Sequence, residues 1–442
     1  MSKSAFFQRA REMRGRSFLF RHLPKILLAF AALLIVGCAT TTTSDMARYE
    51  RQDASWRSAM TGYLNSPEAD AQNNAWTDYF QALAATDYRF YLDNRNKLDN
   101  NEEPLASQFL ELTLPAIASV ELGNKKPFAR YPHWSKLGDN PFVVSVEPSM
   151  KMRALRNALN LKASKHESEG KLNEATATYE NALTFWNRAA DGNAILTHNM
   201  VCRACQRDAF GRIQGLMTRK SLTTAQLDRL VSFLESYQLD KSTVLKSLGA
   251  EKEFEQWVIE NPDEAKKQIK KKDAVDADWK RSTRKAVARV AGRQEEILRQ
   301  TDEIWQTAAE AWNNPSWSDF VKSDVDQRLL EDHDKFFYPL LPGISKIRFH
   351  EELTHADLRL TLLDAAIRRY HVQNGRWPDS LNQLALKTAP VDPFTGASFV
   401  YRLEDGKPVL YSLGPDMKDD NGKKQYDSDK GIKGKGDIVV EF

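Results

Sequence analysis

The last part of the chain, residues 350–442, constrains the fold more than any other stretch. From Leu353 onward the apolar residues recur at spacings that alternate between three and four, which places them on one face of a helix. Asn374-Gly375 ends this pattern, and Pro378 prevents it from resuming. We therefore predict a long helix with one apolar face. The stripe consists of Leu353, Ala356, Leu360, Leu363, Ile367 and Tyr370.

A β-hairpin is predicted after that helix. Residues 379–384 (DSLNQL) first predict a short helix that begins at a capping residue. Phe399, Tyr401 and Leu403 then alternate up to the turn signal at residues 404–406 (EDG), and residues 409–413 return as the second strand. Six aspartates follow, at positions 416, 419, 420, 427, 429 and 437, and the last of them begins the terminal segment DIVVEF.

Residues 46–345 are predicted to be helical. They are rich in Ala, Leu, Glu, Lys and Arg, lack strand-like alternation and carry Gly and Pro in clusters. We expect amphipathic helices near 46–64, 72–94 and 104–121, an ordered connector at 123–149, and a helix over 150–169 that Gly170 ends. Residues 223–226 (TTAQ) fit a capping box at the start of another helix.

The predicted fold class is α+β. A large all-α region, residues 46–345, with the connector near 123–149 as a division between two possible helical subdomains, precedes a small domain, residues 346–442.

One helix pair within the all-α region has a recognisable pattern. Ala163, Gly170, Ala175, Tyr179 and Ala182 follow one another at spacings of 7, 5, 4 and 3. The pattern resembles a tetratricopeptide-type repeat, in which small residues let two helices approach and the aromatic ring fills the gap. It occurs in a single copy, whereas a stacked solenoid needs about three repeats. An ordinary antiparallel helical hairpin explains the spacing equally well.

The N-terminal residues resemble the leader of a bacterial lipoprotein. Seven Lys and Arg side chains precede an apolar run at 26–37 that is too short to span a membrane, and residues 35–38 (IVGC) are similar to a lipobox. The resemblance implies that 1–37 is a removed signal peptide, that Cys38 is lipidated, with palmitate among its acyl chains, and that 38–45 is a tether. Ala39 after the cysteine implies the outer membrane, with the protein facing the periplasm. The alternative is an uncleaved membrane anchor.

Charge and cysteine content exclude some functions. Beyond residue 37 the chain keeps 56 basic and 59 acidic side chains, a net charge of −3, and such a protein is a poor general binder of nucleic acid. Cys202 and Cys205 form a CxxC pattern within a helix. A zinc site would need two further ligands, and the sequence has no second CxxC or paired His. We therefore predict a structural role, either as two buried small residues or as a local disulfide.

The C-terminal motifs together resemble the periplasmic domain of the major pseudopilin family of type II secretion. The resemblance rests on NGRWP at 374–378, DPFTG at 392–396 and YSLGPD at 411–416, in that order. It implies a helix on a small antiparallel sheet, a Ca²⁺ ion in the loop after the hairpin and a link to type II secretion. A pseudopilin, however, begins with a hydrophobic helix continuous with this domain. Here a lipobox and residues 46–345 stand in that place, so a filament subunit is not predicted.

The predicted calcium site lies in the aspartate-rich loop. Ca²⁺ takes about six to eight oxygen ligands, and clustered carboxylates repel one another without a cation. By the motif, Asp416 matches the ligating aspartate, and Leu413 matches the residue that offers its carbonyl. The further candidates are Asp419 or Asp420, Asp427 or Asp429, and Asp437. The alternative is a solvated loop in which interspersed lysines neutralise the acids.

Two functions follow as hypotheses. The first is a non-enzymatic, lipid-anchored envelope protein whose helical scaffold presents a calcium-stabilised domain to a protein partner in the envelope or a secretion machine. The second is an envelope hydrolase with an active site in the helical region, for which His198, Asp208 and Glu251 are the candidates. Residues 350–355 (HEELTH) resemble a zinc-binding HExxH, but the second histidine comes at i+5, about 140° around the helix, so the two cannot share a metal.

Overall fold

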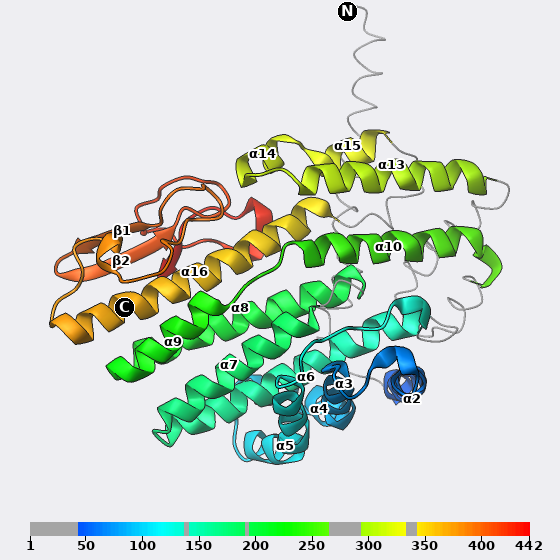
Figure 1. Ribbon diagram of the computed structural model, residues 1–442, viewed down its shortest axis with the longest axis horizontal. Helices are drawn as coiled ribbons and strands as arrows, with labels where there is room; N and C mark the ends of the chain where they lie inside the picture. Colours follow the sequence, from blue (N-terminus) through cyan, green and yellow to red (C-terminus); the bar gives the residue numbers. More distant parts are fainter. Residues whose placement is uncertain (1–42, 137–140, 191–193, 265–292, 333–342) are drawn as a thin grey trace, which may run out of the picture.

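The computed structural model describes residues 43–136, 141–190, 194–264, 293–332 and 343–442, so the predicted leader and Cys38 lie outside the described residues. Helices dominate, and a small antiparallel sheet lies near the C-terminus (Figure 1), which confirms the α+β class at this level. None of the described helices is long and apolar enough to cross a membrane.

The helices have the following bounds: α2 (Thr43–Leu64), α3 (Trp76–Ala85), α4 (Tyr88–Asp99), α5 (Leu105–Gly123), α6 (Pro141–Ser168), α7 (Leu172–Ala189), α8 (Leu196–Arg219), α9 (Thr224–Ser236), α10 (Ser242–Glu260), α13 (Gln294–Trp312), α14 (Trp317–Lys322), α15 (Val325–Asp332) and α16 (Ile344–Asn374). Short 3-10 turns occur at Pro67–Ala69, Trp134–Lys136, Leu381–Gln383 and Ser428–Lys433.

The N-terminal helices share one hydrophobic core. Trp56 of α2, Trp76 of α3 and Phe109 of α5 are completely buried in it, together with residues of α6, α7 and the first half of α8. Burial of such large rings contributes about 1.5–3 kcal/mol each. This core holds α2 to α5 against α6.

Three helix boundaries in this part were predicted wrongly. The single helix expected over 72–94 is divided, because the carboxylate of Asp87 accepts a hydrogen bond from the amide of Phe90 (2.9 Å) and so caps α4 as a new helix. The connector is shorter than expected because α6 begins at Pro141, and proline suits a first helical turn. α2 begins at Thr43, so the last three residues of the predicted tether are helical.

The predicted hairpin of α6 and α7 is present. Gly170 between the two helices has a φ of 73°, a conformation that glycine adopts without steric cost. Ala163, Ala175, Tyr179 and Ala182 are all buried. The close helix pair is thus confirmed, while membership in the tetratricopeptide class stays a prediction.

The predicted capping box opens α9. The hydroxyl of Thr223 accepts a hydrogen bond from the amide of Gln226 (3.3 Å), and the Gln226 side chain accepts one from the amide of Thr223 (2.9 Å). Such reciprocal bonds satisfy two amides that the helix itself leaves unpaired. They fix where α9 starts after α8.

α16 is the helix on which α8, α9, α13 to α15 and the sheet pack. It runs for 31 residues and lies between α8 and α9 on one side and the sheet on the other (Figure 1). Its N-terminal half packs into a core with α10, α13, α14 and α15, and its C-terminal half into a second core with α7, α8, α9 and the sheet. The predicted stripe is buried except for the half-buried Tyr370. The helix ends at Asn374 as predicted, because Gly375 turns to a φ of 69°.

The predicted hairpin is also present. β1 (Val400–Glu404) and β2 (Lys407–Ser412) pair antiparallel around Asp405-Gly406, whose φ angles of 49° and 74° suit a type I′ turn. β3 (Ile438–Val440) pairs with the other side of β2, so the sheet order is β1-β2-β3. The short helix predicted over 379–384 is only a 3-10 turn at Leu381–Gln383, because Ser380 provides no side-chain cap.

A domain boundary was predicted between residues 345 and 346, and the core at the C-terminal half of α16 contains residues from both sides of it. Leu360 and Leu363 of α16 share that core with Phe210 of α8 and Leu230 of α9. The apolar stripe of α16 is therefore covered by helices from the other side of the predicted boundary. The division itself stays a prediction, which an unfolding experiment can test.

Leu363→Ala should destabilise the whole described protein. Leu363 is 1% exposed, so its truncation should lower the free energy of unfolding by about 2–5 kcal/mol. We expect a single calorimetric transition that moves to lower temperature, whereas Leu112→Ala, at a site 46% exposed, should change little. Two transitions of which only one responds would instead support a separate 346–442 domain.

Candidate functional site

Two of the C-terminal motifs meet at Asp392. This buried residue opens DPFTG, and its Oδ2 accepts hydrogen bonds from the hydroxyl of Ser412 (2.9 Å) and the amide of Leu413 (3.1 Å), both in YSLGPD. Its Oδ1 accepts a bond from the amide of Phe394 (3.0 Å). Burial raises the pKa of Asp392, and these hydrogen bonds oppose the rise. One carboxylate thus joins the loop before the hairpin to the end of β2.

The third motif, NGRWP, closes the end of α16 against the sheet. The ring of Trp377 stacks on His371 at a centroid distance of 3.8 Å and meets Phe442 edge-on at 6.0 Å. The carbonyl of the next residue, Pro378, accepts a hydrogen bond from the hydroxyl of Tyr401 in β1 (2.7 Å). The motif therefore holds the helix end, β1 and the last residue together.

The aspartate-rich loop is folded around Asp437, which has no exposed surface. Its Oδ2 accepts hydrogen bonds from the amides of Gly422 (2.8 Å) and Asp420 (3.1 Å). Its backbone amide donates to the carbonyl of Lys424 (2.8 Å), and its carbonyl accepts from the amide of Tyr426 (2.8 Å). A single residue just before β3 therefore fixes the course of 420–426.

Two glycines allow the segment after β2 and the segment before β3 to touch. Gly414 has a φ of 68°, and a Cβ there would lie 2.7 Å from the carbonyl oxygen of Gly436. Gly436 has a φ of 107°, and a Cβ there would lie 2.6 Å from the carbonyl oxygen of Lys424. No side chain fits at either position, so the close approach requires glycine.

The other carboxylate oxygen of Asp437, Oδ1, is buried and has no hydrogen-bond partner among the described residues. Burial raises the pKa of this carboxyl, the two amide hydrogen bonds oppose the rise, and the charges of Asp419 and Asp420 add to it. An unpaired buried acceptor costs about 1–3 kcal/mol, and more when it is charged. A bound cation would remove that cost, so this oxygen fits the predicted Ca²⁺.

The remaining predicted ligands are not gathered around Oδ1 of Asp437. Oδ1 of Asp419 accepts hydrogen bonds from the hydroxyl of Tyr411 (2.8 Å) and the amide of Asn421 (2.7 Å). Asp416 accepts only a long bond of 3.4 Å, from the amide two residues on. Asp427 forms an ion pair of 3.0 Å with the lysine three residues on. Each of these carboxylates already has a contact within the loop.

The rest of the predicted set is placed as follows. The carboxylate of Asp420 lies 3.9 Å from the Lys424 ammonium, the amide of Leu413 is held by Asp392, and the side chain of Asp429 lies outside the described residues. Within the described ranges no three His, Cys, Asp or Glu side chains gather closely enough to hold a metal ion. The structure thus offers one well-placed oxygen with two neighbouring carboxylates, and calcium stays a prediction.

The aspartate-rich loop packs against α14 and α16. Trp317 of α14 donates its indole N–H to the carbonyl of Pro415 (2.9 Å) and packs edge-on against Phe394 (5.5 Å between ring centroids). Phe349 of α16 faces Tyr426 of the loop at 6.1 Å between ring centroids. The loop and the scaffold are therefore in direct contact.

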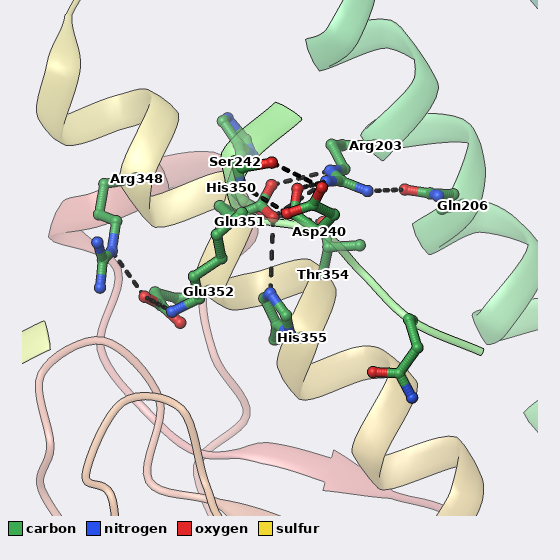
Figure 2. A network of polar contacts seen from close by, with 12 residues as sticks. Arg203, Gln206, Asp240, Ser242, Arg348, His350, Glu351, Glu352, Thr354 and His355 are labelled. Atoms are coloured by element: carbon green, nitrogen blue, oxygen red, sulfur yellow. Dashed lines mark hydrogen bonds and ion pairs between the residues drawn. The ribbon is translucent and has the colours of Figure 1, made fainter. Parts of the chain in front are cut away.

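A network of buried charges occupies the N-terminal half of α16 (Figure 2). Arg203 of α8 donates two hydrogen bonds to the carboxylate of Glu351, of 2.8 and 3.1 Å, and a third of 3.1 Å to Gln206. The paired side chains are only 4% and 1% exposed. Burial alone would raise the pKa of Glu351, but Arg203 and His355 hold it below its usual value. This forked pairing is the strongest type of charged hydrogen bond.

A second ion pair extends the network along α16. The carboxylate of Glu352 forms an ion pair with Arg348 (2.6 Å) and accepts a hydrogen bond from Lys241, in the segment before α10 (3.1 Å). Arg348 also donates to the carbonyls of Trp312 and Asn314 at the end of α13. The charges therefore connect α16 with α8, with the start of α10 and with α13.

These contacts account for the segment that resembles a zinc motif. Glu351 and Glu352 are both engaged by cationic side chains, and the Nε2 of His355 lies 3.5 Å from the Glu351 carboxylate. Burial, together with the nearby Arg207 and Lys346, lowers the pKa of His350 to about 4. The acids of HEELTH act as partners of buried cations in this structure.

His198, the first residue considered for a hydrolase, is part of a core. It is 1% exposed and packs against the rings of Trp76 (5.6 Å between centroids) and Tyr131 (5.1 Å). Its Nε2 is 3.0 Å from the carbonyl of Ala189. Burial lowers its pKa to about 4, so the ring is neutral at physiological pH.

The other two candidates do not join it in one cluster. Glu251 accepts a hydrogen bond from the amide of Leu196 at the start of α8 (3.2 Å), and burial raises its pKa to about 7. Asp208 lies ten residues beyond His198 on α8, about 15 Å along the axis, where it accepts a bond from Asn160 (2.7 Å). The hydrolase hypothesis stays a prediction that these three residues do not strengthen.

A groove of about 370 Å³ lies beside the network, between α9, α16 and residues 387–391. Its charged groups have partners within the protein. Arg359 donates to the carbonyl of Val391 (2.7 Å), and Lys387 pairs with Glu235.

Cys202 and Cys205 are both free and buried, which agrees with the first of the two structural interpretations and not with a local disulfide. The Sγ of Cys202 lies 3.9 Å from the sulfur of Met152 on α6. Burial raises the pKa of Cys205 to about 12 and that of Cys202 well above its usual value, so neither thiol ionises at physiological pH.

Comparison of the chain with protein-family models, curated protein sequences and solved structures gives no match. The resemblances to lipoproteins and to the major pseudopilin therefore rest on the motifs themselves. The charge network was not predicted from the sequence, because Arg203 and Glu351 are 148 residues apart and an isolated ion pair has no periodic pattern. The sequence signal that could have revealed it was the pair of adjacent acids, Glu351 and Glu352, in a segment predicted to be helical.

Glu351→Gln should destabilise the protein by about 3–5 kcal/mol at pH 7, because it leaves the buried Arg203 without a counter-charge. The folded-state pKa of Glu351 is below its unfolded value, so its stabilisation is present above about pH 4.3 and is lost as the pH falls through the folded-state pKa. Urea denaturation should therefore show a gap between wild type and variant that narrows on acidification.

Glu303→Gln is the matched control. Glu303 pairs with Arg299 on the surface, with side chains 49% and 63% exposed, and its loss should cost less than about 1 kcal/mol. Equal effects of the two substitutions would contradict a special role for the buried pair.

Proposed function

We propose that this chain is a non-enzymatic, lipid-anchored protein of a bacterial cell envelope, in which a helical scaffold presents the C-terminal sheet and its aspartate-rich loop to a protein partner. The observation that carries the proposal is the loop's construction: it is folded around the buried Asp437 and rests on α14 and α16. A loop held in this way offers a partner a fixed shape. The order of the three C-terminal motifs supports a partner associated with type II secretion.

In this proposal Ca²⁺ stabilises the presented loop. Asp437 would supply the unpaired Oδ1, and Asp419 and Asp420 are the nearest carboxylates, whose charges already act on it. Asp416 and the carbonyl of Leu413 are the ligands that the motif adds. The ion would supply charge compensation for these acids and the missing partner for a buried oxygen.

Calcium should raise the melting temperature of the full chain. Binding only to the folded state adds about 2.7 kcal/mol of stability when free Ca²⁺ is about 100-fold above the dissociation constant. Asp437→Asn should abolish the calcium-induced shift in a thermal-shift assay. In EDTA the same substitution should leave the melting temperature unchanged or raise it, because a carboxyl with a raised pKa is destabilising once it is charged.

Asp405→Asn provides the control for this experiment. Asp405 is an exposed aspartate in the hairpin turn, where asparagine tolerates the positive φ of 49°. The Asp405→Asn variant should show the same calcium-induced rise in melting temperature as the wild type. A wild-type melting temperature that does not respond to millimolar Ca²⁺ would refute the metal part of the proposal and leave the anchored scaffold to be judged separately.

Cys38→Ser should release the protein from membranes. Several acyl chains on one residue anchor a protein stably, and serine lacks the sulfur that carries one of them. After cell fractionation we expect the variant in the soluble fraction and Cys202→Ser, a buried-site control, in the membrane fraction. Membrane retention of Cys38→Ser would favour the uncleaved anchor.

A further inference from the structure

A stripe of polar residues on α6 faces both α4 and α8. Arg153, Arg156, Asn157 and Asn160 recur at helical spacing on one side of α6. The side-chain amide of Asn157 donates to Asp99 at the end of α4 (3.0 Å). The side-chain amide of Asn160 donates to Asp208 of α8 (2.7 Å). These two bonds fix the stripe between the neighbouring helices, and we call it the α6 arginine stripe.

The arginines of the stripe lack matching acids. Arg153 is half-buried and makes no hydrogen bond or ion pair within the described part of the chain. The Nε of Arg156 is buried and has no hydrogen-bond partner among the described residues, and the nearest carboxylate oxygen, on Asp208, is 3.9 Å away. That oxygen already accepts from Asn160 and from Arg212 (3.3 Å).

Further charges of the same sign surround this position. Arg95 of α4 acts electrostatically on Arg153, and Arg95, Arg153 and Arg156 all act on the buried Tyr91. Arg95 has Asp99 at 3.5 Å. Among the described residues, Arg153 and the Nε of Arg156 have no carboxylate within hydrogen-bond distance, so positive charge is in excess on this side of α6.

An excess of this kind destabilises a folded protein unless an anion offsets it. Like charges repel, and the repulsion grows as their surroundings become less polar. A guanidinium also has five N–H donors in a planar fork, and unpaired buried donors cost about 1–3 kcal/mol each. Both costs disappear if an anion with several acceptor oxygens sits between the arginines.

We propose that the α6 arginine stripe binds a phosphate-type anion between Arg153 and Arg156. Guanidinium forks match the oxygens of a phosphate group and form pairs of charge-assisted bonds with it. A phosphate monoester carries up to two negative charges and a phosphodiester headgroup carries one, and either would offset guanidinium charge at the stripe. Arg153 and Arg156 are both half-buried, so the stripe is in partial contact with solvent.

The phosphate group can belong to free phosphate or to a lipid headgroup, and the experiment separates the two. The test uses the full chain with Cys38→Ser, so that acyl chains do not bring the protein to vesicles. Inorganic phosphate at pH 7.5 should raise its melting temperature relative to chloride of equal ionic strength. Flotation with phosphatidylglycerol and with phosphatidylcholine vesicles should show whether an anionic lipid is bound.

Arg153→Gln should lower the apparent phosphate affinity at least tenfold and raise the melting temperature in the absence of phosphate, because it removes like-charge repulsion. Arg299→Gln, at an exposed and paired arginine, should behave like the parent in both respects. A response to phosphate without flotation assigns free phosphate as the ligand, and flotation on phosphatidylglycerol that Arg153→Gln abolishes assigns a lipid headgroup. Equal responses of Arg153→Gln and its parent, or no response to either ligand, overturn the proposal.

Discussion

The ion pair between Arg203 and Glu351 is the interaction on which the arrangement of the described helices depends. Two charges taken out of water cost several kcal/mol each unless they remain paired in good geometry. Here the pair joins α8 to α16 at the place where the three hydrophobic cores approach one another. Any arrangement that separated α8 from α16 would leave both charges unpaired. The apolar cores supply most of the stability, and the ion pair selects one way of assembling them.

The C-terminal loop follows a similar rule on a smaller scale. Asp392 and Asp437 are buried carboxylates whose hydrogen bonds go mainly to backbone amides of other segments. Such bonds depend on the course of the chain, and Gly414 and Gly436 allow the close approach that this course requires. Oδ1 of Asp437 differs from the other oxygens because nothing in the described residues satisfies it. This unpaired oxygen is the feature of the loop on which the proposed calcium binding depends.

The sequence predicted those elements whose causes are local. The stripe of α16, the capping box at Thr223 and the turn at Asp405-Gly406 each depend on residues a few positions apart, and all three are present. The division between α3 and α4 was missed because Asp87 had to be recognised as a cap inside an apparently continuous pattern. The charge network and the contact between Trp317 and Pro415 join residues far apart in the chain, 98 positions in the latter case, and no local pattern reports them. For the candidate site, the motifs pointed to the aspartate-rich loop as a whole, and only the folded structure singled out Asp437 within it.

The placement of α16 in two cores has a mechanical consequence. The helix is about 46 Å long and carries buried ion pairs in one half and a buried apolar stripe in the other. The pairs of Glu351 with Arg203 and of Glu352 with Lys241 oppose sliding or rotation of the helix, because either movement would separate these charges. Because the ion pairs and the sheet contacts are at opposite ends of one helix, α16 couples the position of the sheet to that of α13 and the start of α10.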